Sequence, residues 1–270
     1  MSSTSNNLPA LPQADISIRT SIAWHPDPPS EPTSTLVLTS PGKHFVDIRL
    51  LLPIDPSGIL TPDRLDWAFA GTSTTNPLPV SLPILTPQPQ PQPDTTPRLV
   101  ASKWSHWVDT RHPDAEIVVD TAQMRIYPDG RSVEVGSMVN PATGVLTPYE
   151  EIWQEGEVDP DEGGMVLQTD DQQGGRRRRG MVVRVGRHIQ GILRVGEGVG
   201  VQRWERSGEH EDGGWEVVAG TGAAAEEEVG DLVGAMEFVA RGGGEKVHAG
   251  EMILGPERAW RVVEVWGRGG

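Results

Sequence analysis

Cysteine is absent from the chain of 270 residues, which excludes disulfides, thiolate nucleophiles and Cys-ligated zinc or iron–sulfur centres. No run of about 18 apolar residues occurs, and the first 30 residues lack the apolar stretch of a secretory signal. We therefore expect neither a membrane span nor export. Basic residues are few, with 23 Lys and Arg against 38 Asp and Glu, and the formal net charge is −15. Such a charge repels phosphate backbones, so we expect no nucleic-acid partner.

Proline and glycine are plentiful but lie in different halves of the chain. Eighteen of the 24 prolines precede residue 100, and 29 of the 32 glycines lie at or after Gly130. A single uniform domain would not be expected to divide so sharply. We therefore predict a disordered tail over residues 1–14, an N-terminal β-barrel over 15–148 and a C-terminal β-barrel over 149–270. The first barrel would carry a Pro-rich insertion at residues 77–97, which cannot join a strand ladder.

Short alternating segments separated by turn residues dominate the rest of the sequence. The clearest hairpin joins Thr35–Thr39 to Lys43–Leu52 through Ser-Pro-Gly, and a second joins 123–127 to 131–135. Ten or more such segments predict an all-β fold of two small antiparallel barrels in tandem.

Three segments depart from this pattern. Apolar residues at helical spacing predict a short helix over 223–240 in the C-terminal half. Leu65–Ala70 is a short apolar segment that we expect to end in a loop of Gly, Ser and Thr. Tyr149–Gln154 is interpreted as a helical turn or the joint between the halves.

The segment Lys103–Asp114 combines two Trp, two His and two Asp. On a regular strand, Trp104 and His106 share one face, whereas Trp107 and Asp109 share the other. The imidazole and the carboxylate would then point apart, which argues against a catalytic base with its orienting partner. We interpret the segment as a barrel wall with Trp in the core. No metal-binding pattern or nucleophile elbow is present, so no catalytic residue, metal or cofactor is assigned.

The segment Met181–Leu193 places polar side chains in an apolar strand. Arg187, His188 and Gln190 would need buried partners there or would line a cavity. The candidate lining of a ligand-binding barrel is therefore a set of six residues: Trp67, Trp104, Trp107, Arg187, His188 and Gln190.

Two further motifs receive structural interpretations. Gly196, Gly198 and Gly200 resemble a phosphate-binding loop, but a strand rather than a helix follows them, so we predict a β-turn. Arg176–Arg179 is a run of four arginines of the kind found in nuclear-localisation signals, and we interpret it as a solvated hairpin tip.

Five blocks of the sequence occur in the order and approximate spacing seen in fungal HRI-type proteins. These blocks are Leu65–Gly71, Trp104–Asp109, Glu151–Gln154, Val185–Leu193 and Trp260–Glu264. Trp-Ala-Phe-Ala-Gly and Gly-Arg-x-Ile-Gln-Gly are the more specific of their motifs. The resemblance extends over about residues 16–266 and identifies the chain as similar to that family.

The resemblance implies two lipocalin-like barrels in tandem and residence in the cytosol, with the nucleus left open as a second location. It implies a casein-kinase-I-type kinase, or another protein, as partner, because the family is named for interaction with a yeast homologue of that kinase. It implies no established enzymatic activity and supplies no catalytic residues. The family position of His188 can be Trp, which argues against catalysis by that histidine.

These observations lead to one main hypothesis and two alternatives. The main hypothesis is a non-enzymatic interaction or ligand-binding protein. The first alternative is a carrier, or a cofactor-independent catalyst of the cyclase type, that holds a small apolar metabolite in a barrel and polarises it with Arg187 or Gln190. The second is a scaffold that docks a kinase through residues 77–97. Homodimerisation through an open strand edge is also left open.

Overall fold

A computed structural model describes residues 13–79, 96–159, 162–208, 214–221, 226–242, 247–253 and 259–267. The expected tail at 1–14 and the Pro-rich insertion at 77–97 lie almost wholly outside these residues.

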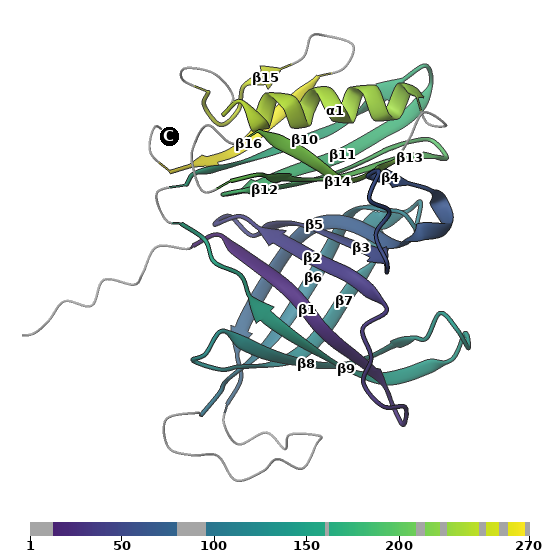
Figure 1. Cartoon of the computed structure of the whole chain (residues 1–270), viewed down its shortest axis with the longest axis vertical. Coiled ribbons are helices and arrows are strands. Elements are labelled where there is room, and N and C mark those ends of the chain that lie inside the picture. The colour runs from purple at the N-terminus through teal and green to yellow at the C-terminus, as the bar shows by residue number, and fades with distance from the viewer. Residues whose placement is uncertain are drawn as a thin grey trace, which may run out of the picture.

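The N-terminal half forms a closed antiparallel barrel of eight strands, in the order β1-β2-β3-β5-β6-β7-β8-β9 (Figure 1). Pairing of β1 with β9 closes it. The barrel strands are β1 (Asp15–Trp24), β2 (Thr33–Thr39), β3 (His44–Leu51), β5 (Leu65–Pro77), β6 (Arg98–Asp109), β7 (Val119–Ile126), β8 (Arg131–Val139) and β9 (Leu146–Glu155).

The C-terminal half forms a second sheet of eight strands, in the order β15-β16-β10-β11-β12-β13-β14-β4. Its edge strand β4 (Ile59–Leu60) comes from the N-terminal half and pairs in parallel with β14. The other strands are β10 (Gly164–Gln173), β11 (Arg176–Val185), β12 (His188–Val195), β13 (Gly198–Arg206), β14 (Trp215–Thr221), β15 (Met252–Ile253) and β16 (Trp260–Trp266).

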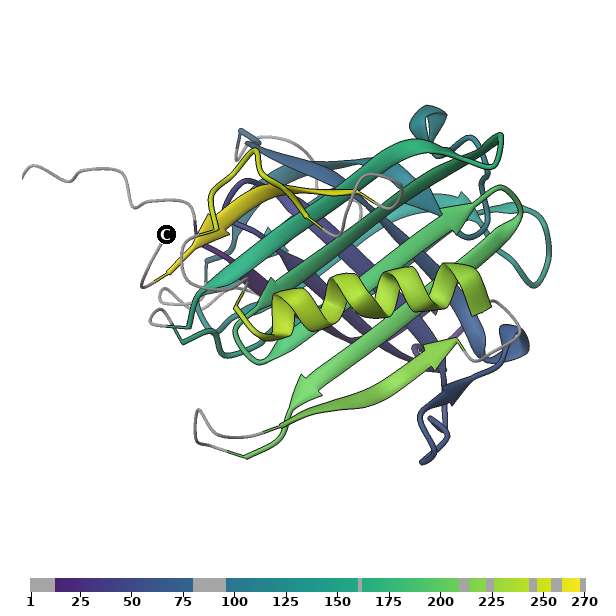
Figure 2. The ribbon, with the colours of Figure 1, turned by 90° about the horizontal axis from the view of Figure 1, so that it is seen from above.

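The described residues include one α-helix, α1 (Glu226–Ala240), and two short 3₁₀ helices, η1 (Pro62–Arg64) and η3 (Ala115–Ile117). The helix crosses the outer face of the second sheet (Figure 2). The predicted fold class, all-β with a short helix in the C-terminal half, is confirmed. None of the helices in the described ranges has the length and apolar character needed to span a bilayer.

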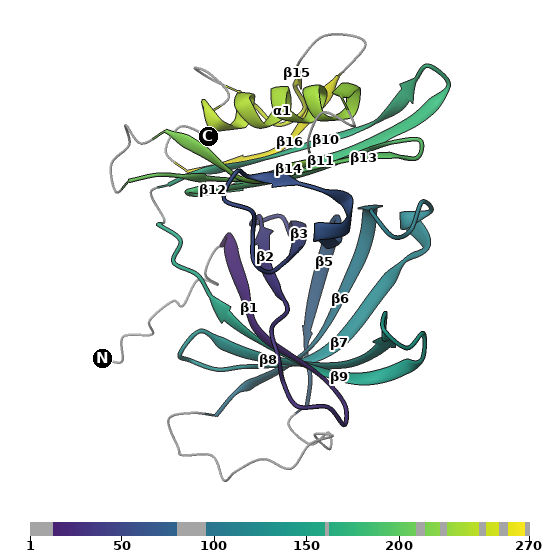
Figure 3. The same cartoon turned by 45° about the vertical axis from the view of Figure 1, so that its right-hand side comes forward.

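The molecule has three layers, with the helix on the second sheet and the second sheet on the barrel wall (Figure 3). Leu232 and Met236 of the helix are fully buried against the sheet. Gly191 of β12 permits this approach, because an added Cβ would lie 2.9 Å from a methyl group of Leu232. Helix and barrel therefore cover opposite faces of the same sheet.

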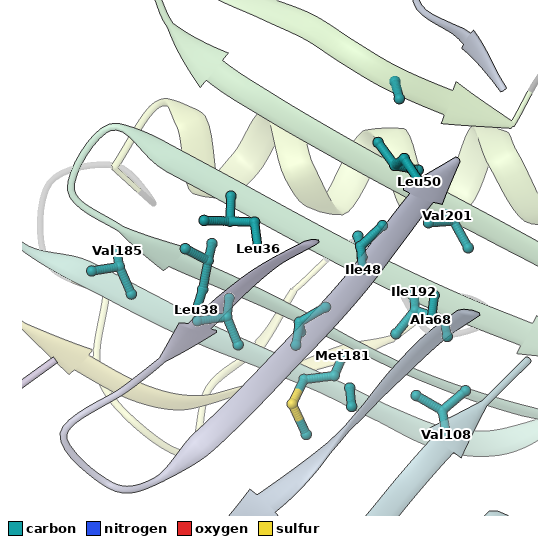
Figure 4. Close-up of a cluster of buried hydrophobic side chains, with 14 of the residues drawn as sticks. Leu36, Leu38, Ile48, Leu50, Ala68, Val108, Met181, Val185, Ile192 and Val201 are labelled. Atoms are coloured by element: carbon teal, nitrogen blue, oxygen red, sulfur yellow. The ribbon is translucent and has the colours of Figure 1, made fainter. Parts of the chain in front are cut away.

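The face between barrel and sheet is a continuous apolar core (Figure 4). Most of its barrel side comes from alternate residues of β2, β3, β5 and β6, and most of its sheet side from β11, β12 and β13. Its fully buried members include Leu38, Val46, Ile48, Ala68, Met181, Val183, Val185, Ile192 and Val201. Both faces of β3 are consequently buried, one in this core and the other inside the barrel.

Several element predictions need correction. Tyr149–Gln154 is neither a helical turn nor a joint but the centre of β9, so the barrel extends past the expected boundary at residue 148. The Gly, Ser and Thr residues after Ala70 continue β5 instead of forming a loop, since they pair with β6 as far as Pro77. The two predicted hairpins are confirmed.

The run Arg176–Arg179 is a solvated hairpin tip only at Arg176 and Arg177, which are exposed beside the turn of β10 and β11. Arg178 is fully buried, and its Nε donates to Asp231 of the helix at 2.7 Å. Arg179 is buried on the opposite face, where its guanidinium lies 4.3 Å from the centre of the Trp107 ring. Strand alternation sends these two neighbours in opposite directions, so they reach the helix layer and the barrel layer respectively.

Candidate functional site

A cavity of about 690 Å³ lies inside the barrel, lined by residues from all eight of its strands. The lining side chains are those whose strand position points inward, whereas their outward neighbours face solvent or the second sheet. The principal lining residues are Val37, Phe45, Asp47, Arg49, Trp67, Phe69, Ser102, Trp104, Met124, Glu134, Tyr149 and Trp153.

One wall of the cavity is aromatic. Trp67 and Phe69 are buried with their ring centres 4.3 Å apart, and Phe45 meets Phe69 edge-on at 5.7 Å. Trp104 packs against the same cluster from β6. These rings provide a large rigid apolar surface of the kind that binds planar or aliphatic molecules.

The polar part of the barrel interior is a cluster of buried charges centred on Arg49. Its Nη2 donates to Asp47 at 2.9 Å, and its Nη1 lies 3.4 Å from Glu151. Arg19 also donates to Glu151, at 2.5 Å, and to Glu31 at 2.9 Å. Burial alone would lower the pKa of Arg49, but the charges of Asp47 and Glu151 raise it above its ordinary value. Both arginines are therefore held as cations by carboxylates.

Glu134 of β8 is a cavity-lining carboxylic acid whose pKa is raised. Burial, followed by the charge of Glu151, raises the pKa of Glu134 to about 8. The hydroxyl of Tyr149 donates to Glu134 Oε1 at 2.7 Å. Gly136 makes room for this tyrosine, since an added Cβ would lie 2.7 Å from its hydroxyl oxygen. At neutral pH the Glu134 carboxyl consequently retains its proton.

His106 lies behind the aromatic wall, stacked on Phe69 with ring centres 4.4 Å apart. Its Nδ1 is 2.8 Å from Asp109 Oδ2, and its Nε2 is 3.1 Å from Asp120 Oδ2. Burial would lower the pKa of His106, but hydrogen bonds to both carboxylates raise it above its ordinary value. Asp109 also accepts the indole proton of Trp67 at 2.9 Å, which fixes that ring in the wall.

The expectation that His106 and Asp109 point apart is therefore wrong. A β-bulge lies between them, because Ala70 pairs with Val108 whereas Gly71 pairs with His106, which leaves Trp107 as the extra residue. The bulge reverses the alternation of side chains along β6, so the Asp109 carboxylate lies on the same side of the strand as the His106 imidazole.

The six candidate lining residues lie in three different parts of the structure. Trp67 and Trp104 line the cavity. Trp107 lies on the outer face of the barrel and contributes to the core against the second sheet. The remaining three belong to the second sheet and do not reach the barrel interior.

Each of those three has a different environment. Gln190 is fully buried and donates to the backbone carbonyls of Leu36 and Val46, at 2.9 Å each, so it joins sheet to barrel. Arg187 lies in the β11–β12 turn and lines a separate pocket of about 450 Å³. His188 is half-buried beside it, and burial lowers its pKa. Polarisation of a barrel ligand by Arg187 or Gln190 is thereby excluded.

The sequence did not identify the ionisable residues of the cavity, above all Arg49 and Glu134. The alternation of Asp47 and Arg49 with Ile48 and Leu50 was visible, but it is also typical of a sheet with one face in water. Among the described residues, no group of three or more His, Asp or Glu side chains is arranged to hold a metal ion.

Comparison with known proteins places this architecture. The family model described as Protein HRI1 matches residues 15–264, nearly the whole described chain. The chain belongs to the HRI1 family. Protein HRI1 of Kluyveromyces lactis is 26% identical over 181 residues, which cover 62% of this chain and 68% of that protein. The crystal structure of an uncharacterized protein from Saccharomyces cerevisiae, YLR301w, shares the fold with a TM-score of 0.64. Its sequence identity is 19%, and the match covers 94% of this HRI1-family chain and 100% of the other.

Proposed function

We propose that this HRI1-family protein is a non-enzymatic binding protein that holds a small, largely apolar molecule inside its barrel. The observation that supports the proposal is the cavity of about 690 Å³ with its wall of aromatic rings. Ligand sites in proteins occupy about 300–1,000 Å³ and are mostly apolar with a few placed polar groups. An eight-stranded barrel is wide enough to hold one such molecule when its side chains do not fill it.

The aromatic wall is rigid before any ligand enters. Trp67 is tied to Asp109 through its indole nitrogen, and Arg49 lies 5.1 Å from the centre of its ring. A site whose rings are already fixed loses little conformational entropy on binding, which favours affinity. This arrangement supports binding rather than a role for the rings as mere core filling.

Native mass spectrometry of protein purified from its own source tests the proposal. We expect a mass above that of the polypeptide, and we expect the excess to disappear on denaturation. The purified protein should then take up the extracted compound again. A bare polypeptide mass, together with failure to bind any extracted compound, would count against the proposal.

Two tryptophans of β6 provide matched variants for this experiment. Trp104→Ala removes part of the cavity wall, and we expect about tenfold weaker binding from the lost apolar contact. Trp107→Ala removes the same side chain from the outer face, where Arg179 covers it. We expect that variant to lower the thermal midpoint but to leave ligand affinity unchanged. Equal loss of binding in both variants would place the ligand elsewhere.

A further inference from the structure

We propose that the molecule held in the barrel is an amphipathic amine, with one protonated nitrogen beside Asp47 and an apolar body against the aromatic wall. This inference rests on the proposed function, since it specifies the ligand class of the same cavity. Charge balance, an unpartnered oxygen and the aromatic surroundings support it independently of one another.

The buried charges of the cluster around Arg49 do not balance. Arg19 and Arg49 are its buried cations, and Asp47, Glu134 and Glu151 are its buried carboxyl groups. Glu31, which also accepts from Arg19, is partly exposed, so water screens its charge. The other cations of the lining, Lys43 and Arg98, are exposed side chains at strand ends, where water screens them as well. The cluster therefore has one buried carboxyl group more than it has buried cations.

An unpartnered oxygen of Asp47 marks the position at which a cationic group of a ligand would bind. The Asp47 side chain is almost fully buried, with 3% of its surface exposed, and it lines the cavity. Oδ2 accepts from Arg49, whereas Oδ1 is buried and has no hydrogen-bond partner. A buried carboxylate oxygen without a donor is destabilising, so a ligand that donates a hydrogen bond there recovers that free energy.

Glu134 responds to the same imbalance by holding a proton. The groups that face it are Tyr149 and Glu151 from β9 and Asp47 and Arg49 from β3. Only one of these four is a cation, and it already binds two carboxylates. An ammonium group in the cavity would stabilise ionised Glu134 and so displace its proton. An anionic ligand, by contrast, would meet Asp47, and the buried cation among the described lining residues, Arg49, already binds two carboxylates.

The aromatic wall suits a cation as well as an apolar body. The guanidinium of Arg49 lies 5.1 Å from the ring centre of Trp67 and 5.5 Å from that of Phe69. Attraction between cations and these ring faces is strongest where water is excluded. A second buried polar atom, the donor Nε1 of Trp153, has no hydrogen-bond partner and belongs to a residue that lines the same cavity. It would bind an oxygen of a ligand that also carries a hydroxyl or carbonyl group.

Three probes of equal length test the ligand class: octylamine, 1-octanol and octanoate, measured by isothermal titration calorimetry at pH 7. We expect octylamine to bind at least about tenfold more tightly than octanol, because it alone donates charge-assisted hydrogen bonds. Octanoate should bind most weakly. Equal or tighter binding of octanol or octanoate would overturn the inference while leaving the proposed function intact.

The variant Asp47→Asn tests whether the amine binds beside Asp47. The variant keeps an acceptor for Arg49 and replaces the unpartnered oxygen by a donor group, so octylamine should bind about tenfold more weakly and octanol should be unaffected. Asp63→Asn removes one carboxylate from an exposed position in η1 and controls for attraction to the acidic surface. We expect that control to change nothing. Equal effects of the two variants would overturn the placement.

Proton release offers a test on the unchanged protein that does not depend on the folding of a variant. Octylamine binding at pH 7 should release up to about one proton, seen as a dependence of the measured enthalpy on the buffer. Glu134→Gln should abolish that release. Absence of proton release from the wild type would contradict the inference. If neither a natural ligand nor any of the three probes binds, the result contradicts the proposed function as well as the inference about the ligand class.

Discussion

Charged side chains in the barrel interior are buried, so each depends on its partners for stabilisation. Arg49 contacts two carboxylates and two aromatic rings, so its removal would leave Asp47 and Glu151 as buried charges without sufficient partners. Such clusters stabilise a protein only while every member is satisfied. The strongest tests at this scale are therefore substitutions that keep the shape and change one charge or one contact.

Glu134→Gln should change how stability depends on pH. The unfolded glutamate has a pKa near about 4.3, whereas burial beside Glu151 raises the folded value to about 8. Between these values the folded state binds the extra proton, so this residue makes the wild type less stable as pH rises. Glutamine can still accept the Tyr149 hydroxyl and does not titrate.

Urea unfolding at pH 5 and pH 8.5 measures the difference between these two proteins. We expect Glu134→Gln to gain stability relative to the wild type as pH rises, with each unit of pKa shift contributing about 1.4 kcal/mol. A difference that is the same at both pH values would show that Glu134 ionises normally in the folded protein.

Gly71→Ala tests the bulge that brings His106 and Asp109 together. An added Cβ at Gly71 would overlap the carbonyl oxygen of Ser105 on the neighbouring strand. We expect a loss of about 1–3 kcal/mol in the free energy of unfolding, because backbone must move. Gly230→Ala in the helix meets no neighbouring atom within 4 Å and should instead gain about 0.5–1 kcal/mol. Thermal denaturation of both variants decides whether the glycine is required.

For much of the candidate site, the sequence indicates which residue types are present but not where their side chains point. Trp67 and Trp104 were recognised as barrel residues because large aromatics in strands usually face a core. Asp109 was misplaced because a bulge depends on the facing glycine of another strand. Arg49 and Glu134 were missed because a polar strand face can lie against water or against a polar interior, and alternation alone does not distinguish the two.

Among the elements, strands bounded by clear turns were predicted well, whereas β9 and the second half of β5 were not. Their residues, Tyr149–Gln154 and the Gly-Thr-Ser-Thr-Thr run, include strand-forming types such as Thr, Tyr and Ile, but neither run alternates apolar with polar side chains. They become strands because neighbouring barrel strands satisfy their backbone groups. Tertiary context supplies at these positions what the local pattern does not.

Helix α1 is attached to the sheet by a buried ion pair, and Asp231→Ala tests it. Asp231 is 5% exposed and binds Arg178, which is fully buried. The substitution leaves a buried guanidinium short of a partner and should be destabilising by about 3–5 kcal/mol. Glu237→Ala on the exposed side of the same helix loses only a surface pair and should change stability by about 0.5 kcal/mol or less. Chemical denaturation of the two variants makes the comparison.

The hairpin of β5 and β6 allows a test of the scaffold hypothesis, in which residues 77–97 dock a casein-kinase-I-type kinase. The strands pair as far as Pro77 and Val100, and Leu78 donates to Leu99 at 2.9 Å. Replacing residues 80–95 by a short Gly-Ser turn should leave the thermal midpoint nearly unchanged, because changes in loop length cost little. Pull-down of the kinase should fail only with the shortened chain if the segment docks it. Capture by both proteins would contradict the scaffold hypothesis.

At the scale of the whole molecule, the two sheets share one core and several polar contacts across it. Arg203 donates to Gln190 at 2.9 Å and to the carbonyl of Ile48 at 2.6 Å, and burial lowers its pKa to about 10. Strand β4 leaves the barrel half and adds to the second sheet. The halves distinguished by their proline and glycine content are thus joined into one packed body.

This packing predicts that barrel and sheet unfold together. Gln190→Ala removes two hydrogen bonds to barrel carbonyls and leaves Arg203 without one acceptor, which should cost about 2–3 kcal/mol. If the units are coupled, hydrogen exchange should show the same loss of opening free energy in peptides of β7, remote from the contact, and of β10. Gln123→Ala, at an exposed position of β7, should alter neither. A loss confined to the peptides of one unit would mean that the barrel opens independently, and ligand binding in its cavity would then stabilise the barrel alone rather than the whole chain.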